Sequence, residues 1–173
     1  SVILTTLAPG NYSAVISASD NRPGVGLVEI YDLSGGSTAQ KLANLSTRGI
    51  GGSGPRSMIV GFVVSGTRPK IVLLRAAGPT LATFGVTGTL ADPQLVLKNS
   101  IGTTVATSAA LWDQSPNAPD IRTATSRVGA FALPAASKDA AFVVTLPAGA
   151  YTVQVNGANA TTGLALVEIY EAP

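Results

Sequence analysis

The sequence Leu166-Val167-Glu168-Ile169-Tyr170 occurs twice in this chain, because residues 27–31 are the same five residues in the same order. At an offset of 139, residues 4–33 align with residues 143–172 without a gap. The other identical positions are Thr6-Leu7 and Thr145-Leu146, Gly10 and Gly149, Tyr12 and Tyr151, and Gly24 and Gly163. The chain therefore contains an internal repeat of its C-terminal segment.

The repeated segment reads as strand, turn and strand. An isolated fragment of this kind, about 30 residues long, is marginal in water because it cannot bury its apolar face. It has to dock on the body of its own chain, on a neighbouring copy, or on a preceding repeat of a longer polypeptide. The repeat therefore points to assembly rather than to a chemical reaction.

Gly and Pro interrupt the chain about every 8 to 12 residues, and the segments between them are rich in Val, Ile, Thr and Leu. We therefore expect an all-β fold, a β-sandwich of the jelly-roll or Ig-like kind, with an extra N-terminal β-hairpin that duplicates the C-terminal hairpin. Helical turns are expected at 80–84 and 120–128, the second capped by Asp120. Strands are expected at 12–18, 26–33, 42–48, 57–66, 70–76, 94–99, 103–108, 141–146, 151–157 and 165–171.

Composition divides the chain into three parts. Residues 1–33 form the N-terminal β-hairpin, which we expect to dock on a neighbouring unit. Residues 34–40 contain Ser34-Gly35-Gly36-Ser37-Thr38 and are predicted to be a flexible linker. Residues 41–173 form the β-sandwich domain. Exchange of the hairpin between chains and folding back on its own body are both compatible with such a linker.

The charge pattern excludes some partners. Charged residues make up 12% of the chain, against about a quarter in a typical protein. The net charge is +2, and the Lys and Arg residues are scattered singly, so we expect no nucleic-acid partner. The longest apolar runs, such as residues 58–64, are far shorter than the roughly 20 residues that span a bilayer. We therefore expect no membrane span.

The chain lacks the side chains of most catalytic and metal sites. It has no His and no Cys, which removes Ser-His-Asp and Cys-His nucleophiles and the usual zinc ligands. We therefore expect no enzyme activity, no catalytic residue, no cofactor and no metal site. Calcium could be held only by dispersed carboxylates, and its binding stays open. The isolated acidic residues are Asp92, Asp113, Asp120 and Asp139.

The two copies of Leu-Val-Glu-Ile-Tyr place Glu29 and Glu168 at equivalent positions. Strand alternation puts each Glu on the face of the preceding Leu and the following Tyr, with Val and Ile on the opposite face. A Glu on a half-buried face needs a partner. The residues that we expect to form such structural ion pairs are Glu29, Glu168, Arg48 and Arg75.

Several stretches together resemble a tandem β-sandwich repeat of large secreted and surface proteins of bacteria, about 140 residues long. They cover nearly all of residues 41–172, and residues 4–33 resemble the end of a preceding repeat. The resemblance implies modular β structure and an exported bacterial protein located outside the cell or at the cell surface. It implies no catalytic activity. The matching stretches are 41–49 (KLANLSTRG), 72–81 (VLLRAAGPTL), 90–95 (LADPQL), 128–134 (VGAFALP), 146–152 (LPAGAYT) and 166–171 (LVEIYE).

Two functional hypotheses follow. The first is an extracellular structural protein that forms filaments or end-to-end arrays by β-strand packing between copies of itself or adjoining repeats. The second is a carbohydrate- or surface-binding module of an adhesin-like protein, favoured if Trp112 and several Tyr are exposed on one face. The residues expected to carry assembly are Leu7, Tyr12, Val15, Leu27, Val28, Ile30, Tyr31, Leu146, Tyr151, Leu166, Val167, Ile169 and Tyr170.

Overall fold

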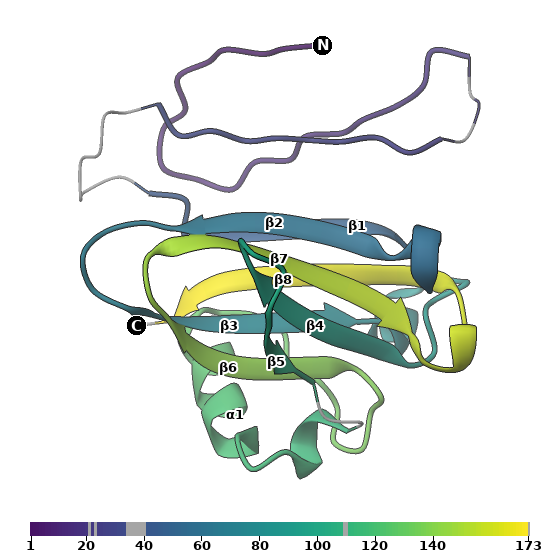
Figure 1. Cartoon of the computed structure of the whole chain (residues 1–173). Helices are drawn as coiled ribbons and strands as arrows, with labels where there is room; N and C mark the ends of the chain where they lie inside the picture. Colours follow the sequence, from purple (N-terminus) through teal and green to yellow (C-terminus); the bar gives the residue numbers. More distant parts are fainter. Residues whose placement is uncertain (21, 23, 34–40, 109–110, 173) are drawn as a thin grey trace. The chain divides into compact units, whose positions relative to one another are not determined.

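The computed structural model describes residues 1–20, 22, 24–33, 41–108 and 111–172. The expected linker, residues 34–40, lies outside them. The chain divides into two compact units, Ser1–Lys41 and Leu42–Pro173. The second unit, called the body from here on, is a sandwich of two antiparallel sheets (Figure 1), and this confirms the expected all-β class.

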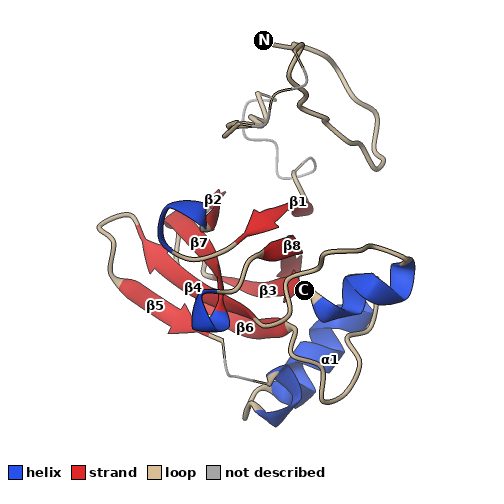
Figure 2. Cartoon of the chain, turned by 90° about the vertical axis from the view of Figure 1, so that its right-hand side faces the viewer, coloured by secondary structure: helices blue, strands red, loops and turns tan. Residues whose placement is uncertain are grey.

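Each sheet of the body has four strands (Figure 2). Sheet A contains β1 (Asn44–Gly51), β3 (Lys70–Ala77), β6 (Ala140–Leu146) and β8 (Gly163–Ala172). Sheet B contains β2 (Met58–Val64), β4 (Pro93–Asn99), β5 (Thr104–Thr107) and β7 (Gly149–Gly157). The strand order is β1-β8-β3-β6 in sheet A and β2-β7-β4-β5 in sheet B. β1 and β2 are therefore edge strands, and so are β5 and β6.

The main core lies between the two sheets. Val153 of β7, Val167 of β8 and Leu74 of β3 are completely buried there. Each of these strands turns one set of alternate side chains toward the other sheet, as the period of two in a β-strand requires. Burial of this inner face is the main source of stability of the body.

A second apolar cluster covers the outer face of sheet A. It joins Leu73 of β3 to Ile121 of the helix α1 (Ala118–Arg127) and to Trp112. Helix α1 and the 3₁₀ helix η2 (Pro79–Phe84) match the two expected helical segments. Asp120 lies in the first turn of α1 rather than at its cap, which is Asn117. The 3₁₀ helices are η1 (Gly54–Arg56), η2 (Pro79–Phe84), η3 (Trp112–Gln114) and η4 (Ala158–Ala160).

The structure corrects the expected C-terminal hairpin. β7 pairs with β2 and β4 in sheet B, whereas β8 pairs with β1 and β3 in sheet A. The connection between β7 and β8 therefore crosses from one sheet to the other. Such a unit is a β-arch, whose two strands face each other through their side chains and share no backbone hydrogen bonds. The sequence alone does not separate an arch from a hairpin, because both read as strand, turn and strand.

The strands expected at 12–18 and 26–33 are not formed. The described residues of the first unit contain no paired strand, and all of them are exposed. An arch cannot pair its own two strands, so these segments would need neighbouring strands to form a ladder. The body supplies such neighbours to β7 and β8.

A core substitution tests the sandwich. We expect Leu74→Ala to lower the free energy of unfolding by about 2 to 5 kcal/mol, because it leaves a cavity between the sheets. Urea unfolding of the full chain measures this loss. Ile101→Ala is the control, since Ile101 is 84% exposed in the turn after β4 and should change stability by less than about 0.5 kcal/mol. Equal losses in both variants would contradict the placement of Leu74.

Candidate functional site

Residues 10–33 align in sequence with β7 and β8 at the offset of 139, and because of this sequence correspondence they are called the N-terminal arch from here on. The hydroxyl of Tyr12 donates a hydrogen bond to the carbonyl of Ala8 at 2.8 Å. The hydroxyl of Tyr151 donates to the carbonyl of Pro147 at 3.0 Å, the same contact at equivalent positions. The same tyrosine-to-carbonyl contact is therefore present at the start of β7 and at the equivalent position of the first unit.

A second local contact is also repeated. The hydroxyl of Tyr31 donates to Glu29 Oε1 at 3.0 Å, and the hydroxyl of Tyr170 donates to Glu168 Oε1 at 2.7 Å. In the N-terminal arch the carboxylate of Glu29 raises the pKa of Tyr31. The first unit thus keeps two local side-chain contacts that the equivalent residues make in the body.

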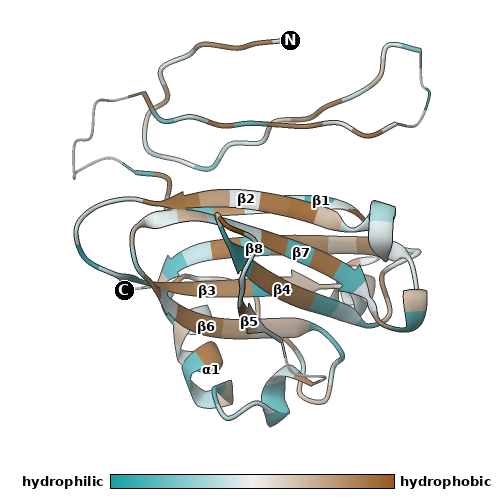
Figure 3. Cartoon of the chain, in the orientation of Figure 1, coloured by the Kyte–Doolittle hydropathy of each residue, from teal (hydrophilic) through white to brown (hydrophobic). Residues whose placement is uncertain are grey.

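The two copies differ in burial. Val167 is 0% and Ile169 6% exposed in the body, whereas their equivalents Val28 and Ile30 are 50% and 53% exposed. Figure 3 shows hydrophobic residues along both segments of the N-terminal arch. The arch therefore has an apolar face that its own unit does not cover.

The residues expected to carry assembly fall into two groups, which differ in burial. Those of the body are already used by its own fold, in the core between the sheets or against the outer apolar cluster of sheet A: Leu146, Tyr151, Leu166, Val167, Ile169 and Tyr170. Those of the first unit are exposed: Leu7, Tyr12, Val15, Leu27, Val28, Ile30 and Tyr31. Only the second group is accessible for contact with a partner.

Glu168 has the arginine partner that alternation suggested. It lies opposite Arg75 in the register of β8 with β3, and Arg75 Nη2 is 2.8 Å from Glu168 Oε2. The two atoms are close but not aligned as a hydrogen bond, so the attraction is mainly Coulombic. Arg48, the other candidate, is exposed on β1 and is not part of this pair.

The sequence did not indicate the other partners of Arg75. Arg75 Nη1 donates to the carbonyl of Phe131 at 2.6 Å, and the guanidinium lies 4.3 Å from the centroid of the Phe131 ring. Phe131 is 56 residues away along the chain, and its contact depends on the loop after α1 folding back on sheet A. No periodicity or motif reports a contact of that kind.

Tyr170 completes this network. Burial raises the pKa of Tyr170 to about 12, and the hydrogen bond to the Glu168 carboxylate acts in the same direction. The phenol therefore stays protonated and keeps donating to Glu168. The fully buried Arg75 and the nearly buried Glu168 hold β3 and β8 together on the outer face of sheet A.

The residues considered for other chemistry have structural roles. Trp112 is buried, and its Nε1 donates to the carbonyl of Pro134 at 3.0 Å. The buried carboxylate of Asp139 accepts hydrogen bonds from the backbone N–H of Gly78 at 2.7 Å and from the Ser137 hydroxyl at 2.7 Å. Within the described parts of the chain, no three His, Cys, Asp or Glu side chains gather as a metal site would require.

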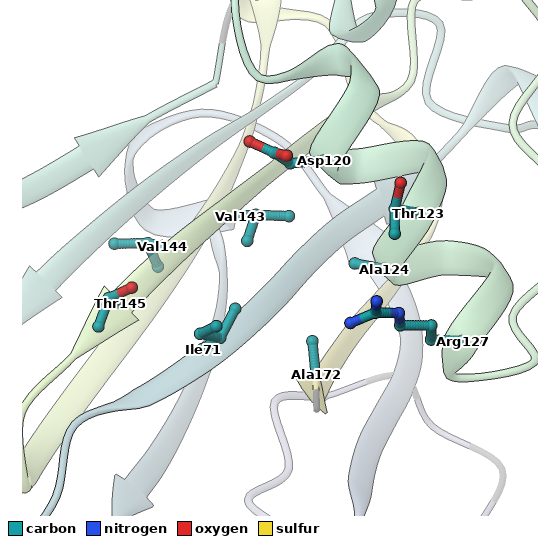
Figure 4. A pocket seen from close by; sticks show the side chains of 9 residues that line it. All are labelled: Ile71, Asp120, Thr123, Ala124, Arg127, Val143, Val144, Thr145 and Ala172. Atoms are coloured by element: carbon teal, nitrogen blue, oxygen red, sulfur yellow. The ribbon is translucent and has the colours of Figure 1, made fainter.

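A pocket of about 360 Å³ lies between α1 and strands β3, β6 and β8 (Figure 4). Ile71, Val143 and Ala172 form its apolar part, while Asp120 and Arg127 reach it from α1. In the described part of the chain, no helix is both long and apolar enough to cross a bilayer. Neither finding identifies a ligand.

No family model matches the chain, and a comparison with curated proteins finds no similar sequence. Among solved structures the chain is similar to the pre-peptidase C-terminal domain of a collagenase from Bacillus anthracis. The identity is 12% and the TM-score 0.44, over 73% of this chain and 88% of that chain. A similarity of this degree carries no functional conclusion.

Removal of Arg75 tests the buried ion pair. We expect Arg75→Ala to lower the free energy of unfolding by about 3 to 5 kcal/mol, because it leaves the Glu168 carboxylate buried without its cation. Arg48→Ala, a control at an exposed position, should change it by less than about 0.5 kcal/mol. Urea unfolding compares the two variants. A loss for Arg75→Ala as small as that of the control would contradict a stabilising pair.

The raised pKa of Tyr170 predicts a pH dependence. The unfolded tyrosine loses its proton near pH 10, but the folded one only near pH 12. Over this range the folded state binds more protons, so stability that is fully present below pH 10 is lost as the pH rises toward 12. Urea unfolding across this range should show a steeper loss for the wild type than for Tyr170→Phe. Parallel curves would contradict the assignment.

Proposed function

We propose that this chain is an extracellular structural protein that forms filaments or end-to-end arrays. The N-terminal arch of one unit packs against β-strands of the adjoining unit. The observation that carries the proposal is the N-terminal arch itself, which repeats the local contacts of β7 and β8 while its apolar side chains stay exposed. No catalytic step is part of this function.

The physical reason is that backbone groups in the described residues of the arch lack hydrogen-bond partners on neighbouring strands. In the body, backbone groups of β7 and β8 are paired with strands on both sides. The N-terminal arch lacks such pairing within its described residues. Adding its strands to a sheet edge would satisfy these groups, and the alternating apolar side chains would set the register.

The body already contains its own copy of the arch. Val153 and Val167 are completely buried in it, so no position is vacant for a donor to fill. The N-terminal arch must therefore add strands to a finished sandwich rather than complete an unfinished one. A contact between two different surfaces of identical units does not have to close on itself, and repeated addition then grows a linear array.

The extracellular location rests on the sequence. The pattern of residues 41–172 resembles repeats of secreted bacterial proteins, and the weakly charged surface suits a packed array. Glycan binding is supported less well, because Trp112 and Tyr151 are only 4% and 7% exposed. Tyr12 and Tyr31 are 58% and 73% exposed, but they lie in the segment that the proposed contact uses. We therefore do not propose it.

Deletion of residues 1–33 tests the proposal. We expect electron microscopy and light scattering to show regular fibres for the full chain and monomers for the deletion variant. The body has its own complete core, so circular dichroism should show that the deletion variant is still folded.

A matched pair of substitutions locates the effect within the first unit. Val28→Asp places a charge on the apolar face of the arch and should abolish assembly. Val2→Asp makes the same change at a residue that is 95% exposed and precedes the repeated segment, and should leave assembly intact. Monodisperse full-length monomers, or fibres unchanged by the deletion, would overturn the proposed function.

A further inference from the structure

We propose that the surface receiving the N-terminal arch is the edge formed by β1 and β2 of a second copy of this chain, and that Glu29 of the arch pairs there with Arg48 of β1. This inference rests on the proposed function and names the partner surface. The arch would add one strand to sheet A and one to sheet B at the same time.

The placement of the two edge strands fits an arch. β1 is the end strand of sheet A and β2 the end strand of sheet B. The two lie at the same side of the sandwich and contact each other across it (Figures 1 and 2). An arch carries one strand for each of two facing sheets. Residues 12–18 and 26–33 form no strands in the first unit, so we expect them to become strands when they pair with the two free edges.

The strand directions also agree. β8 runs antiparallel to β1, and β7 runs antiparallel to β2. An arch placed on the free side of β1 and β2, in the same orientation as β7 and β8, is antiparallel to both of them. Residues 24–33 would then extend sheet A, and residues 12–18 would extend sheet B. One orientation of the arch thus satisfies both pairings.

The opposite side of the sandwich is less suitable. β5 has only four residues, and its register with β4 is interrupted between Leu97 and Lys98. β6 packs against α1. Short strands, bulges and covering helices are the usual ways in which proteins block an edge. β1 and β2 have eight and seven residues and uninterrupted registers, so theirs is the open edge.

Apolar side chains remain exposed on β1 and β2. Ile50 is 68%, Ile59 60% and Val63 73% exposed. On the inner side, Leu45 and Phe62 are only partly buried against the core, because no strand lies beyond them. Docking of the arch would place further apolar side chains beside these exposed residues on the outer faces and beside the partly buried residues on the inner faces. The core of the sandwich would then continue into the arch.

The charges complement each other as well. In the body, the neighbouring strand supplies Arg75 to Glu168. Glu29 is the equivalent of Glu168, and its hydrogen bond from Tyr31 is the same. In the register that β1 forms with β8, residue 168 is opposite Ser46, two positions from Arg48 on the same face. Glu29 in this register would be a diagonal neighbour of the exposed Arg48, within reach of its long side chain.

Charge reversal in the full chain tests this surface. Glu29→Arg and Arg48→Glu each turn the attraction into a repulsion between identical copies, and each should raise the critical concentration for fibres about tenfold. Arg68→Glu, the same charge change in the exposed loop after β2, is the control and should leave it unchanged. Urea unfolding should show equal stability for all variants, because the three positions are exposed.

Mixing the two single variants identifies the partner. Each arch then meets an oppositely charged edge only on the other variant, so an equimolar mixture should assemble at the wild-type concentration. Rescue by the double variant Glu29→Arg, Arg48→Glu but not by mixing would show docking on the chain's own edge and overturn the proposal. Wild-type assembly by both single variants, with loss on deletion of residues 1–33, would place the receiving surface elsewhere while leaving the proposed function intact.

Discussion

The two strands of a β-arch cannot hydrogen-bond to each other, because each belongs to a different sheet. Every backbone group that β7 and β8 expose along their edges must be paired by another strand. In the body, β2 and β4 do this for β7, and β1 and β3 do it for β8. The sandwich can therefore be described as a set of strands gathered around one arch, and a copy of that arch without those strands is structurally incomplete.

The N-terminal copy separates local from tertiary determinants of this structure. The contacts that it keeps, from Tyr12 to Ala8 and from Tyr31 to Glu29, join residues no more than four positions apart. The features that its described residues lack are strand pairing and burial, which depend on residues from outside the segment. Burial of the apolar side chains on one arch face is worth roughly 25 cal/mol per Å². The exposed N-terminal copy does not gain this free energy of burial within its own unit. A partner that covers its apolar side chains would provide it.

The same distinction explains what the sequence could predict. Alternation correctly placed Glu168 on the face opposite Val167 and Ile169, because that pattern depends only on strand geometry. Choosing between Arg48 and Arg75 as its partner required the strand order, which no local pattern contains. For the same reason, the sequence pattern of residues 143–172 does not distinguish a hairpin from an arch. The hydrogen bonds that hold Asp139 and the packing of Phe131 on Arg75 join distant segments, and the sequence gives no signal for them.

The two sides of the sandwich give the proposed array a direction. The side formed by β5 and β6 is blocked by a short strand, a bulge and α1, so growth there by strand addition is disfavoured. The side formed by β1 and β2 is open and carries a positive charge at Arg48. A charge on an edge strand opposes pairing with a second copy of the same edge, but it suits an arch that carries Glu29. Arg48 thus distinguishes between two ways in which identical bodies could associate, and it favours the one that continues in a single direction.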